Sequence, residues 1–225
     1  MNNHSLIQLD LIIFDWDGTL MDSTDHIVRI IHQVFTEYGL PVPTQEATKN
    51  IIGLSLYQAM AELTPNLSKN DHLHLINAYK HHYVKDIEKI TLFDGVVEGL
   101  HLLKKQGALL AIATGKSRAG LDLALQKTQL KHLFAATRTV DECPSKPNPE
   151  MIYSLLKELD IPPNRVVMIG DTCYDLAMAN SASVFGVGVS YGAQQKQNLI
   201  TCSPLAIFDN FLSLQQWLLK NLSHT

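Results

Sequence analysis

The sequence of 225 residues contains few cysteines, no long apolar run and no strong excess of either charge. Its three cysteines, Cys143, Cys173 and Cys202, form no dense framework, which is typical of a protein in a reducing compartment. Its longest apolar runs are far shorter than the roughly 20 residues that span a bilayer. The net charge of −4 gives no electrostatic reason to expect a nucleic acid or an anionic membrane as a partner. The first residues lack a basic segment followed by an apolar one, so we expect a cytoplasmic protein with no secretory signal.

What the sequence does contain is enough apolar material for a substantial core. Apolar residues make up 46% of the chain and charged residues 18%, which argues against disorder. A chain of this length can form one α/β domain with a modest insertion. We therefore expect a folded globular protein.

Short aliphatic runs alternate with segments of helical spacing over most of the chain. The pattern predicts buried strands and the helices that connect them. Predicted strands cover residues 11–14, 109–114, 134–137, 165–170 and 184–189, with a small edge strand at 205–208, and predicted helices cover 96–106, 117–128, 147–159, 175–180 and 211–222. This alternation indicates an α/β fold with a Rossmann-like parallel sheet, helices on both faces and right-handed crossovers.

One long segment departs from this alternation and shows helical spacing with no convincing strand. Predicted helices there cover residues 22–38, 44–52, 55–63 and 68–89, and Thr44, Ser55 and Ser68 are suited to cap the last three. We therefore expect an α/β core domain of residues 1–21 and 90–225 and an inserted all-helical cap domain of residues 22–89. Because the insertion leaves just after the first strand, we expect the cap to cover a pocket at that end of the sheet.

The first predicted strand ends in residues that can form a ligand site. Asp15 and Asp17 alternate with Trp16, so both carboxylates can face one pocket, and Gly18 allows a sharp turn. In open α/β sheets ligands bind outside the carboxyl ends of the strands. The position of the two aspartates therefore favours a functional site over an ordinary surface turn.

Other residues suited to the same site follow other predicted strands. Thr114 ends the second strand and Asp171 follows the fourth. Lys146 lies in the loop before the helix that leads into the fourth strand. Because the carboxyl ends of parallel strands meet at one edge of the sheet, we expect these side chains to gather near the two aspartates.

The segment Asp15-Trp16-Asp17-Gly18-Thr19-Leu20, preceded by a hydrophobic strand, resembles motif I of the haloacid dehalogenase-like (HAD) superfamily. Thr114-Gly115, Lys146-Pro147 and Gly170-Asp171-Thr172-Cys173-Tyr174-Asp175 resemble its other motifs, and the resemblance covers essentially the whole chain. The most similar branch is the phosphoglycolate phosphatase-like one, whose helical cap is inserted after motif I. The resemblance implies a phosphoric monoester hydrolase that acts on a small phosphorylated metabolite, either phosphoglycolate-like or a sugar phosphate.

The resemblance also implies a Mg²⁺-dependent mechanism with an aspartyl-phosphate intermediate. Asp15 would be the nucleophile, and Asp17 would protonate the leaving oxygen and later deprotonate the attacking water. Asp15, the backbone carbonyl of Asp17 and Asp171 would bind Mg²⁺ through hard oxygen atoms. Asp175 would orient a bound water or the motif lysine, and direct ligation by Asp175 stays open.

Three further residues are assigned to phosphate binding by the same resemblance. The Thr114 hydroxyl and the Gly115 N–H would bind phosphate where a helix begins. Lys146 would offer a compact positive charge to the phosphoryl oxygens and to Asp15. Thr114 and Lys146 thus join the two aspartates of motif I as candidate catalytic residues.

Several related activities stay open. Dehalogenases and phosphonate-cleaving relatives lack the second acid of motif I, which is present here as Asp17, so Lys49 is interpreted as a surface lysine and not as a Schiff-base residue. A phosphosugar mutase or a pyrophosphatase of the same superfamily would keep both acids. Outside enzymes, the alternative is a non-catalytic binding module on the same scaffold. The sequence identifies neither the substrate nor the oligomeric state.

Three features near the motifs receive a structural interpretation. Residues 116–118 are interpreted as solvated positions at a helix start, with a contribution to the phosphate site as the alternative. Residues 53–55 either form a simple turn between helices or reach the pocket. Cys173 is interpreted as a small filler and not as a redox group.

Overall fold

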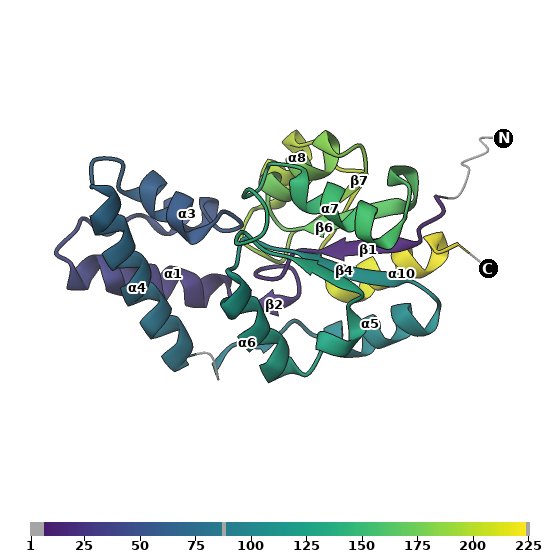
Figure 1. Cartoon of the computed structure of the whole chain (residues 1–225), viewed down its shortest axis with the longest axis horizontal. Helices are drawn as coiled ribbons and strands as arrows, with labels where there is room; N and C mark the ends of the chain where they lie inside the picture. Colours follow the sequence, from purple (N-terminus) through teal and green to yellow (C-terminus); the bar gives the residue numbers. More distant parts are fainter. Residues whose placement is uncertain (1–6, 87–88, 224–225) are drawn as a thin grey trace.

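The computed structural model describes residues 7–86 and 89–223, and a parallel sheet of six strands lies at its centre (Figure 1). In spatial order the strands are β5 (Ala136–Arg138), β4 (Leu109–Ala113), β1 (Leu11–Phe14), β6 (Val166–Gly170), β7 (Phe185–Val189) and β8 (Ala206–Phe208). Every neighbouring pair is parallel. The predicted α/β fold with a Rossmann-like sheet is therefore confirmed.

Strand β1 is one of the two central strands of the sheet and has a partner on each side. Leu11 pairs with Leu109 of β4 and with Val166 of β6. The chain first adds β4 and β5 on one side of β1 and then crosses to β6 on the other side. This reversal creates a crevice outside the carboxyl ends of β1 and β6, which is where sheets of this kind bind ligands.

Helices cover both faces of the sheet, and the side chains of β1 are apolar on both of these faces. Ile12 and Phe14 pack in one apolar cluster with residues of α5 (Val96–Lys105) and α10 (Phe211–Asn221). Leu11 and Ile13 pack in a second cluster with residues of α7 (Glu150–Leu159) and α8 (Cys173–Ser181). A strand buried on both faces is expected to be a continuous hydrophobic run, and β1 is one.

The remaining helices of the core are short or lie at its edge. They are α6 (Arg118–Thr128), α9 (Lys196–Thr201) and the two 3₁₀ turns η2 (Lys131–Leu133) and η3 (Pro163–Arg165). Helix α6 begins after Ser117, whose hydroxyl accepts a hydrogen bond from the Gly120 N–H. None of the described helices combines the length and the apolar character that a bilayer crossing would need.

The first four described helices after β1 form a separate lobe, which we call the cap. They are α1 (Thr24–Glu37), α2 (Gln45–Asn50), α3 (Leu56–Leu63) and α4 (Lys69–Asp86). Helix α1 packs on α2 and α4, and α3 packs on α4. As predicted, Thr44 and Ser55 accept N-terminal hydrogen bonds, from Ala47 and Gln58.

The chain segments that enter and leave the cap are hydrogen-bonded to each other. Strand β2 (Met21–Asp22) pairs antiparallel with β3 (Thr91–Leu92). In Figure 1 the cap helices lie together beyond one end of the large sheet. The division of the chain into two domains at residues 22 and 89 stays a prediction, and this paired ribbon lies at both of its boundaries.

The structure corrects the interpretation of one cysteine. Cys173, at the first position of α8, forms a disulfide with Cys202, which follows α9. The two residues are 29 positions apart, and their Cα atoms are 5.9 Å apart. Cys173 is therefore not a simple filler, while Cys143 is buried and unpaired.

Candidate active site

Three buried carboxylates meet at the carboxyl ends of β1 and β6. Asp15 directly follows β1, Asp171 directly follows β6, and Asp175 lies in the first turn of α8. One oxygen of each lies within 4.8 Å of the others, and each residue is at most 1% exposed. Like charges at this separation in a buried site are unfavourable unless a cation or a proton neutralises them.

The electrostatics of the cluster follow from burial and mutual repulsion. Burial raises the pKa of Asp15 from 3.8 to about 7, with Lys146 opposing and Asp175 adding to the rise. Burial, Asp15 and Asp175 together raise the pKa of Asp171 well above its usual value of 3.8. The charged form of both groups thus needs more positive charge than the described side chains supply.

Lys146 is the cation inside this cluster. Its side chain is fully buried, and Nζ lies 2.7 Å from Asp15 Oδ1 and donates a 2.6 Å hydrogen bond to Asp175 Oδ1. Burial alone would lower the pKa of Lys146, but the charges of Asp15 and Asp175 raise it, so the ammonium stays charged. Asp175 is fixed in turn by hydrogen bonds from the N–H and hydroxyl of Thr172, in the capping box of α8.

Asp171 lies in a close-fitting polar recess. It accepts hydrogen bonds from the Thr19 hydroxyl at 2.9 Å and from the Ala193 N–H at 2.7 Å. Gly18 lies in the left-handed region at φ +79°, and a Cβ there would come within 2.2 Å of Asp171 Oδ2. Glycine at position 18 therefore both makes the turn and leaves room for the Asp171 carboxylate.

Asp17 faces the cap and has a different set of partners from Asp15. Its side chain is 13% exposed and accepts a 2.7 Å hydrogen bond from the Ser23 hydroxyl. Lys116 Nζ donates to Asp17 Oδ2 at 2.8 Å and Oδ1 at 3.1 Å, and also to the hydroxyl of Tyr83 in α4 at 2.9 Å. The Lys116 side chain is only 10% exposed, so the interpretation of this lysine as a solvated residue is wrong.

The loop after β4 contacts the cap directly. A Cβ on Gly115 would lie 2.6 Å from the carbonyl oxygens of both Gly53 and Leu54. The Ser55 N–H donates a 2.9 Å hydrogen bond to the Ser145 hydroxyl of the core. Of the two interpretations of residues 53–55, the structure therefore favours the one in which they reach the pocket.

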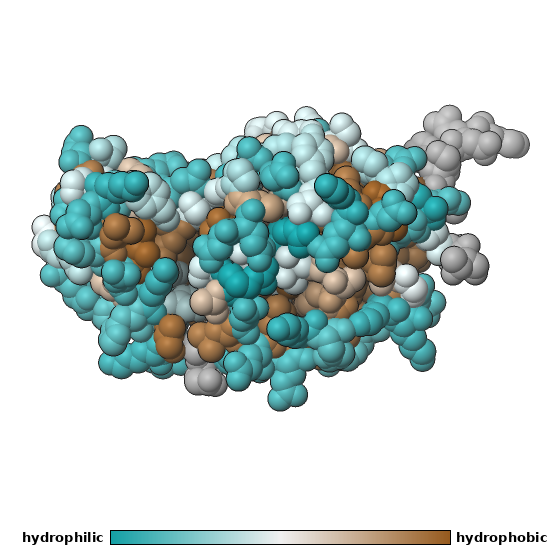
Figure 2. Space-filling view, viewed as in Figure 1, coloured by the Kyte–Doolittle hydropathy of each residue, from teal (hydrophilic) through white to brown (hydrophobic). Residues whose placement is uncertain are grey.

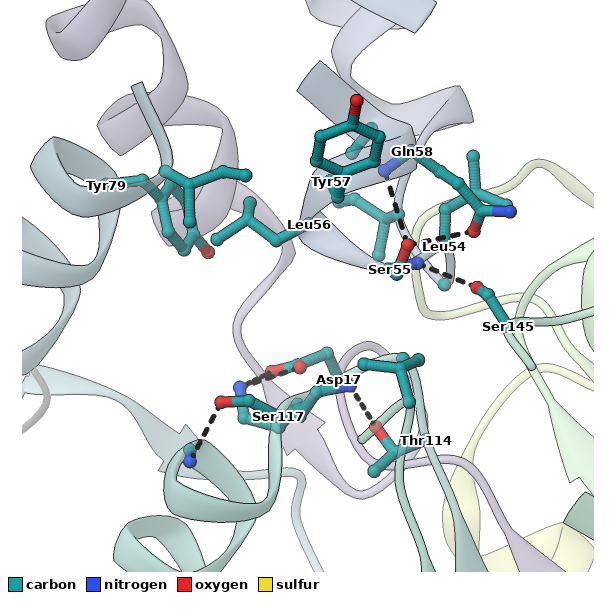
Figure 3. A pocket seen from close by; sticks show the side chains of 18 of the residues that line it. Asp17, Leu54, Ser55, Leu56, Tyr57, Gln58, Tyr79, Thr114, Ser117 and Ser145 are labelled. Carbon is teal, nitrogen blue, oxygen red and sulfur yellow. Dashed lines mark hydrogen bonds and ion pairs between the residues drawn. The ribbon is translucent and has the colours of Figure 1, made fainter. Parts of the chain in front are cut away.

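A cavity of about 830 Å³ lies between α1, α3 and α4 of the cap and the carboxyl edge of the sheet. Asp15 and Asp17 line it on the core side, together with Thr114. Figure 3 shows Leu56 and Tyr79 of the cap across the open space from Asp17 and Thr114. The cavity thus joins the acidic motif to the inner wall of the cap.

Comparison with known proteins agrees with this geometry. A family model described as haloacid dehalogenase-like hydrolase matches residues 12–189. The chain belongs to this family. The resemblance of its motifs to those of the HAD superfamily is therefore confirmed.

Several named relatives of this HAD-family hydrolase are phosphatases. It is 28% identical over 217 residues to a phosphoglycolate phosphatase of Mannheimia succiniciproducens, covering 92% of this chain and 97% of the relative. It is 31% identical over 208 residues to IndB of Dickeya dadantii, which is named a probable phosphatase, and the match covers 89% of this chain and 90% of the relative. The crystal structure of a predicted phosphoglycolate phosphatase from Haemophilus somnus has a TM-score of 0.82 at 26% identity, covering 93% and 97%. These similarities support a phosphatase activity.

The HAD motifs recognised in the sequence meet in one place. The structure places at the cavity or buried beside Asp15 all the residues that the sequence assigns to the site: Asp15, Asp17, Thr114, Gly115, Lys146, Asp171 and Asp175. Their individual roles stay predictions. Among the residues that contact this group, Ser23 and Tyr83 were missed, and Lys116 was considered only as an alternative. The position of Lys116 directly after Thr114-Gly115 was the only available signal, and nothing in the sequence marks Tyr83.

Proposed function

We propose that this HAD-family phosphatase hydrolyses a small phosphorylated metabolite through an aspartyl phosphate on Asp15, with Mg²⁺ as cofactor. The observation that carries the proposal is the buried cluster of Asp15, Asp171 and Asp175 around Lys146, open to a cavity on the Asp15 side. A purely structural cluster would not need three carboxylates around one ammonium beside a large cavity.

The donor set of the cluster fits Mg²⁺. Its atoms are hard oxygens, and the raised pKa of Asp15 and Asp171 reflects a shortage of positive charge that a divalent ion would supply. Asp15, Asp171 and the backbone carbonyl of Asp17 would hold the ion. When bound, Mg²⁺ neutralises charge on the phosphoryl group and so permits an anionic nucleophile to approach it.

In the first step, an Asp15 carboxylate oxygen forms a bond to phosphorus while the bond from phosphorus to the leaving oxygen breaks. Lys146 is held beside Asp15 by Asp175 and keeps the attacking carboxylate in place. Thr114 lines the same part of the cavity and would donate to a phosphoryl oxygen together with the Gly115 N–H.

Asp17 would transfer the protons in both steps. It faces the cavity, gives a proton to the leaving oxygen, and then takes one from the water that attacks the aspartyl phosphate. Ser23 and Lys116 hold its carboxylate in one orientation. A mutase would instead return the phosphoryl group to a substrate hydroxyl, so release of inorganic phosphate distinguishes the two.

The proposal is tested by phosphate release from p-nitrophenyl phosphate in the presence of Mg²⁺. We expect turnover by the unaltered protein, loss of turnover in excess chelator, and no turnover by Asp15→Asn. Asp25→Asn, a change of the same kind at a side chain that is 85% exposed, is the matched control and should retain activity. Full activity of Asp15→Asn would contradict the covalent mechanism.

A further inference from the structure

The cap side of the active-site cavity is almost entirely apolar. Figure 2 shows apolar side chains gathered on the cap over α3 and α4, beside the hollow between cap and core. The cap residues whose apolar side chains line the cavity include Ile27, Ile31, Ile52, Leu56, Ile76 and Tyr79. A leaving group of two carbons, such as glycolate, would leave most of a cavity of about 830 Å³ filled with water.

The inner part of the cavity offers little positive charge for a second anionic group. Among the described residues that line it, the basic side chains are Lys80 and Lys116. Lys80 is exposed to solvent on α4. Lys116 is already bound to both oxygens of Asp17 and to the hydroxyl of Tyr83. A carboxylate or a second phosphate deep in the cavity would therefore compete with Asp17 for Lys116, and the only other lysine among these residues, Lys80, lies at the solvent-exposed side.

Three serines at the cavity wall already take part in hydrogen bonds within the protein. Ser55 donates to Gln58, Ser145 accepts from the Ser55 N–H, and Ser117 accepts from the Gly120 N–H at the start of α6. A site built to recognise a sugar would present unpaired donors and acceptors to the substrate. These serines contribute to the protein's own hydrogen bonds, and most of the other cap residues at the wall are apolar.

We propose that the preferred substrate is a phosphate monoester of a neutral, largely apolar alcohol or phenol that is larger than glycolate. This inference rests on the proposed phosphatase function and adds the class of the leaving group. In the proposed complex the phosphoryl group lies at Asp15 and the apolar group extends from Asp17 toward the cap. Figure 3 shows Leu56 and Tyr79 across the open space from Asp17. The contact of Gly53 and Leu54 with Gly115 holds this wall close to the acids.

The inference is tested by kcat/KM for ethyl, butyl and hexyl phosphate, measured beside phosphoglycolate and pyrophosphate. We expect kcat/KM to rise by up to about fourfold for each added methylene group, because each is transferred from water to an apolar wall. Hexyl phosphate should exceed both phosphoglycolate and pyrophosphate. Hexylphosphonate, which is not hydrolysed, should inhibit competitively and more strongly than ethylphosphonate.

A matched pair of variants tests the wall itself. Leu56→Lys places a cation in the cavity, and we expect it to lower kcat/KM for hexyl phosphate about tenfold or more, and to raise kcat/KM for phosphoglycolate. Leu212→Lys, the same change at a leucine that is 58% exposed on α10, should alter neither value. If Leu56→Lys does not fold, the alkyl series and the phosphonate inhibition of the unaltered protein still decide the question.

Two outcomes would overturn the inference and can be told apart. In the first outcome, phosphate is released from all esters, but kcat/KM does not depend on chain length or is highest for phosphoglycolate. This outcome would reject the apolar substrate class and leave the phosphatase function intact. No phosphate release from any ester with Mg²⁺ present would reject the phosphatase function, and the substrate class with it.

Discussion

Lys116 Nζ lies 2.8 Å from Asp17 Oδ2 and 2.9 Å from the hydroxyl of Tyr83, so one side chain joins the proposed general acid to the cap. The ammonium also lies 4.4 Å from the centre of the Tyr83 ring. Burial alone would lower the pKa of Lys116, but the charge of Asp17 raises it, so the side chain is a cation. The orientation of Asp17 therefore depends on where the cap lies.

Replacing this lysine should impair proton transfer more than substrate binding. Lys116→Met removes the partner that fixes both oxygens of Asp17, so we expect kcat to fall about tenfold or more, with a smaller change in KM. Steady-state kinetics with p-nitrophenyl phosphate measure the two constants separately. Lys105→Met, at an exposed position of α5, is the matched control. An unchanged kcat would show that Asp17 keeps its orientation without Lys116.

The contact between the loop after β4 and the cap can be tested with a single methyl group. Gly115→Ala would place a Cβ within 2.6 Å of two cap carbonyl oxygens, so the cap must move outward. We expect kcat/KM to fall by up to about 100-fold for every ester, since small displacements of catalytic groups are costly. Gly120→Ala, whose Cβ would meet the Ser117 hydroxyl at 3.2 Å, should have little effect. Equal activity of the two variants would argue against a closed cap during catalysis.

The carboxylate cluster predicts that Mg²⁺ binding stabilises the folded protein, and this effect can be measured without turnover. Mg²⁺ should raise the Tm of the unaltered protein, because it relieves repulsion among Asp15, Asp171 and Asp175 in the folded state only. Asp171→Asn should abolish most of this rise, and Asp25→Asn should preserve it. Calorimetry with and without excess chelator measures both. A rise of the same size in Asp171→Asn would place the metal ion elsewhere.

Because Cys173 and Cys202 form a disulfide, a thiol reductant should lower the stability of the protein. Closing a loop of this length restricts the unfolded chain, so reduction should lower the free energy of unfolding by about 2–4 kcal/mol. Urea unfolding with and without a thiol reductant gives the value, and Cys202→Ser should show no response. Titration of the unfolded, unreduced protein should find one free thiol, that of Cys143. Three free thiols would contradict the pairing.

Much of the fold was predictable because its elements are long and regular. The hydrophobic run of β1 and the helical spacing of α1 and α10 appear in the structure within a few residues of their predicted bounds. Helix α9 was missed because it has six residues and, unlike α2 with Thr44, no capping side chain marks its start. The ribbon of β2 and β3 was missed because two residues are too few to show a periodicity. The prolines before α7 precede the helix, which begins at Glu150.

The site was predictable where it depends on motifs and not where it depends on packing. Strand ends of a parallel sheet must meet, so the gathering of Asp15, Thr114 and Asp171 follows from their positions in the sequence. Lys116 has a long flexible stem that suits solvent as well as a buried partner, so its contact with Asp17 does not follow from sequence.

The cysteines show the same limit. A spacing of 29 residues does not indicate that the Cα atoms of Cys173 and Cys202 lie 5.9 Å apart, because that distance depends on how α8 and α9 pack. The disulfide also removes the cysteine-based argument for a reducing compartment. The cytoplasmic location expected from the sequence stays a prediction.

The central claim is that Asp15 becomes phosphorylated during turnover, and mass spectrometry of acid-quenched protein tests it most directly. After brief incubation with p-nitrophenyl phosphate and Mg²⁺, the account predicts one added phosphoryl group, located on the peptide that contains Asp15. The adduct should be absent in Asp15→Asn and should persist longer in Asp17→Asn, which lacks the base for its hydrolysis. Rapid turnover with no adduct in either the unaltered protein or Asp17→Asn, or an adduct on another residue, would contradict the account.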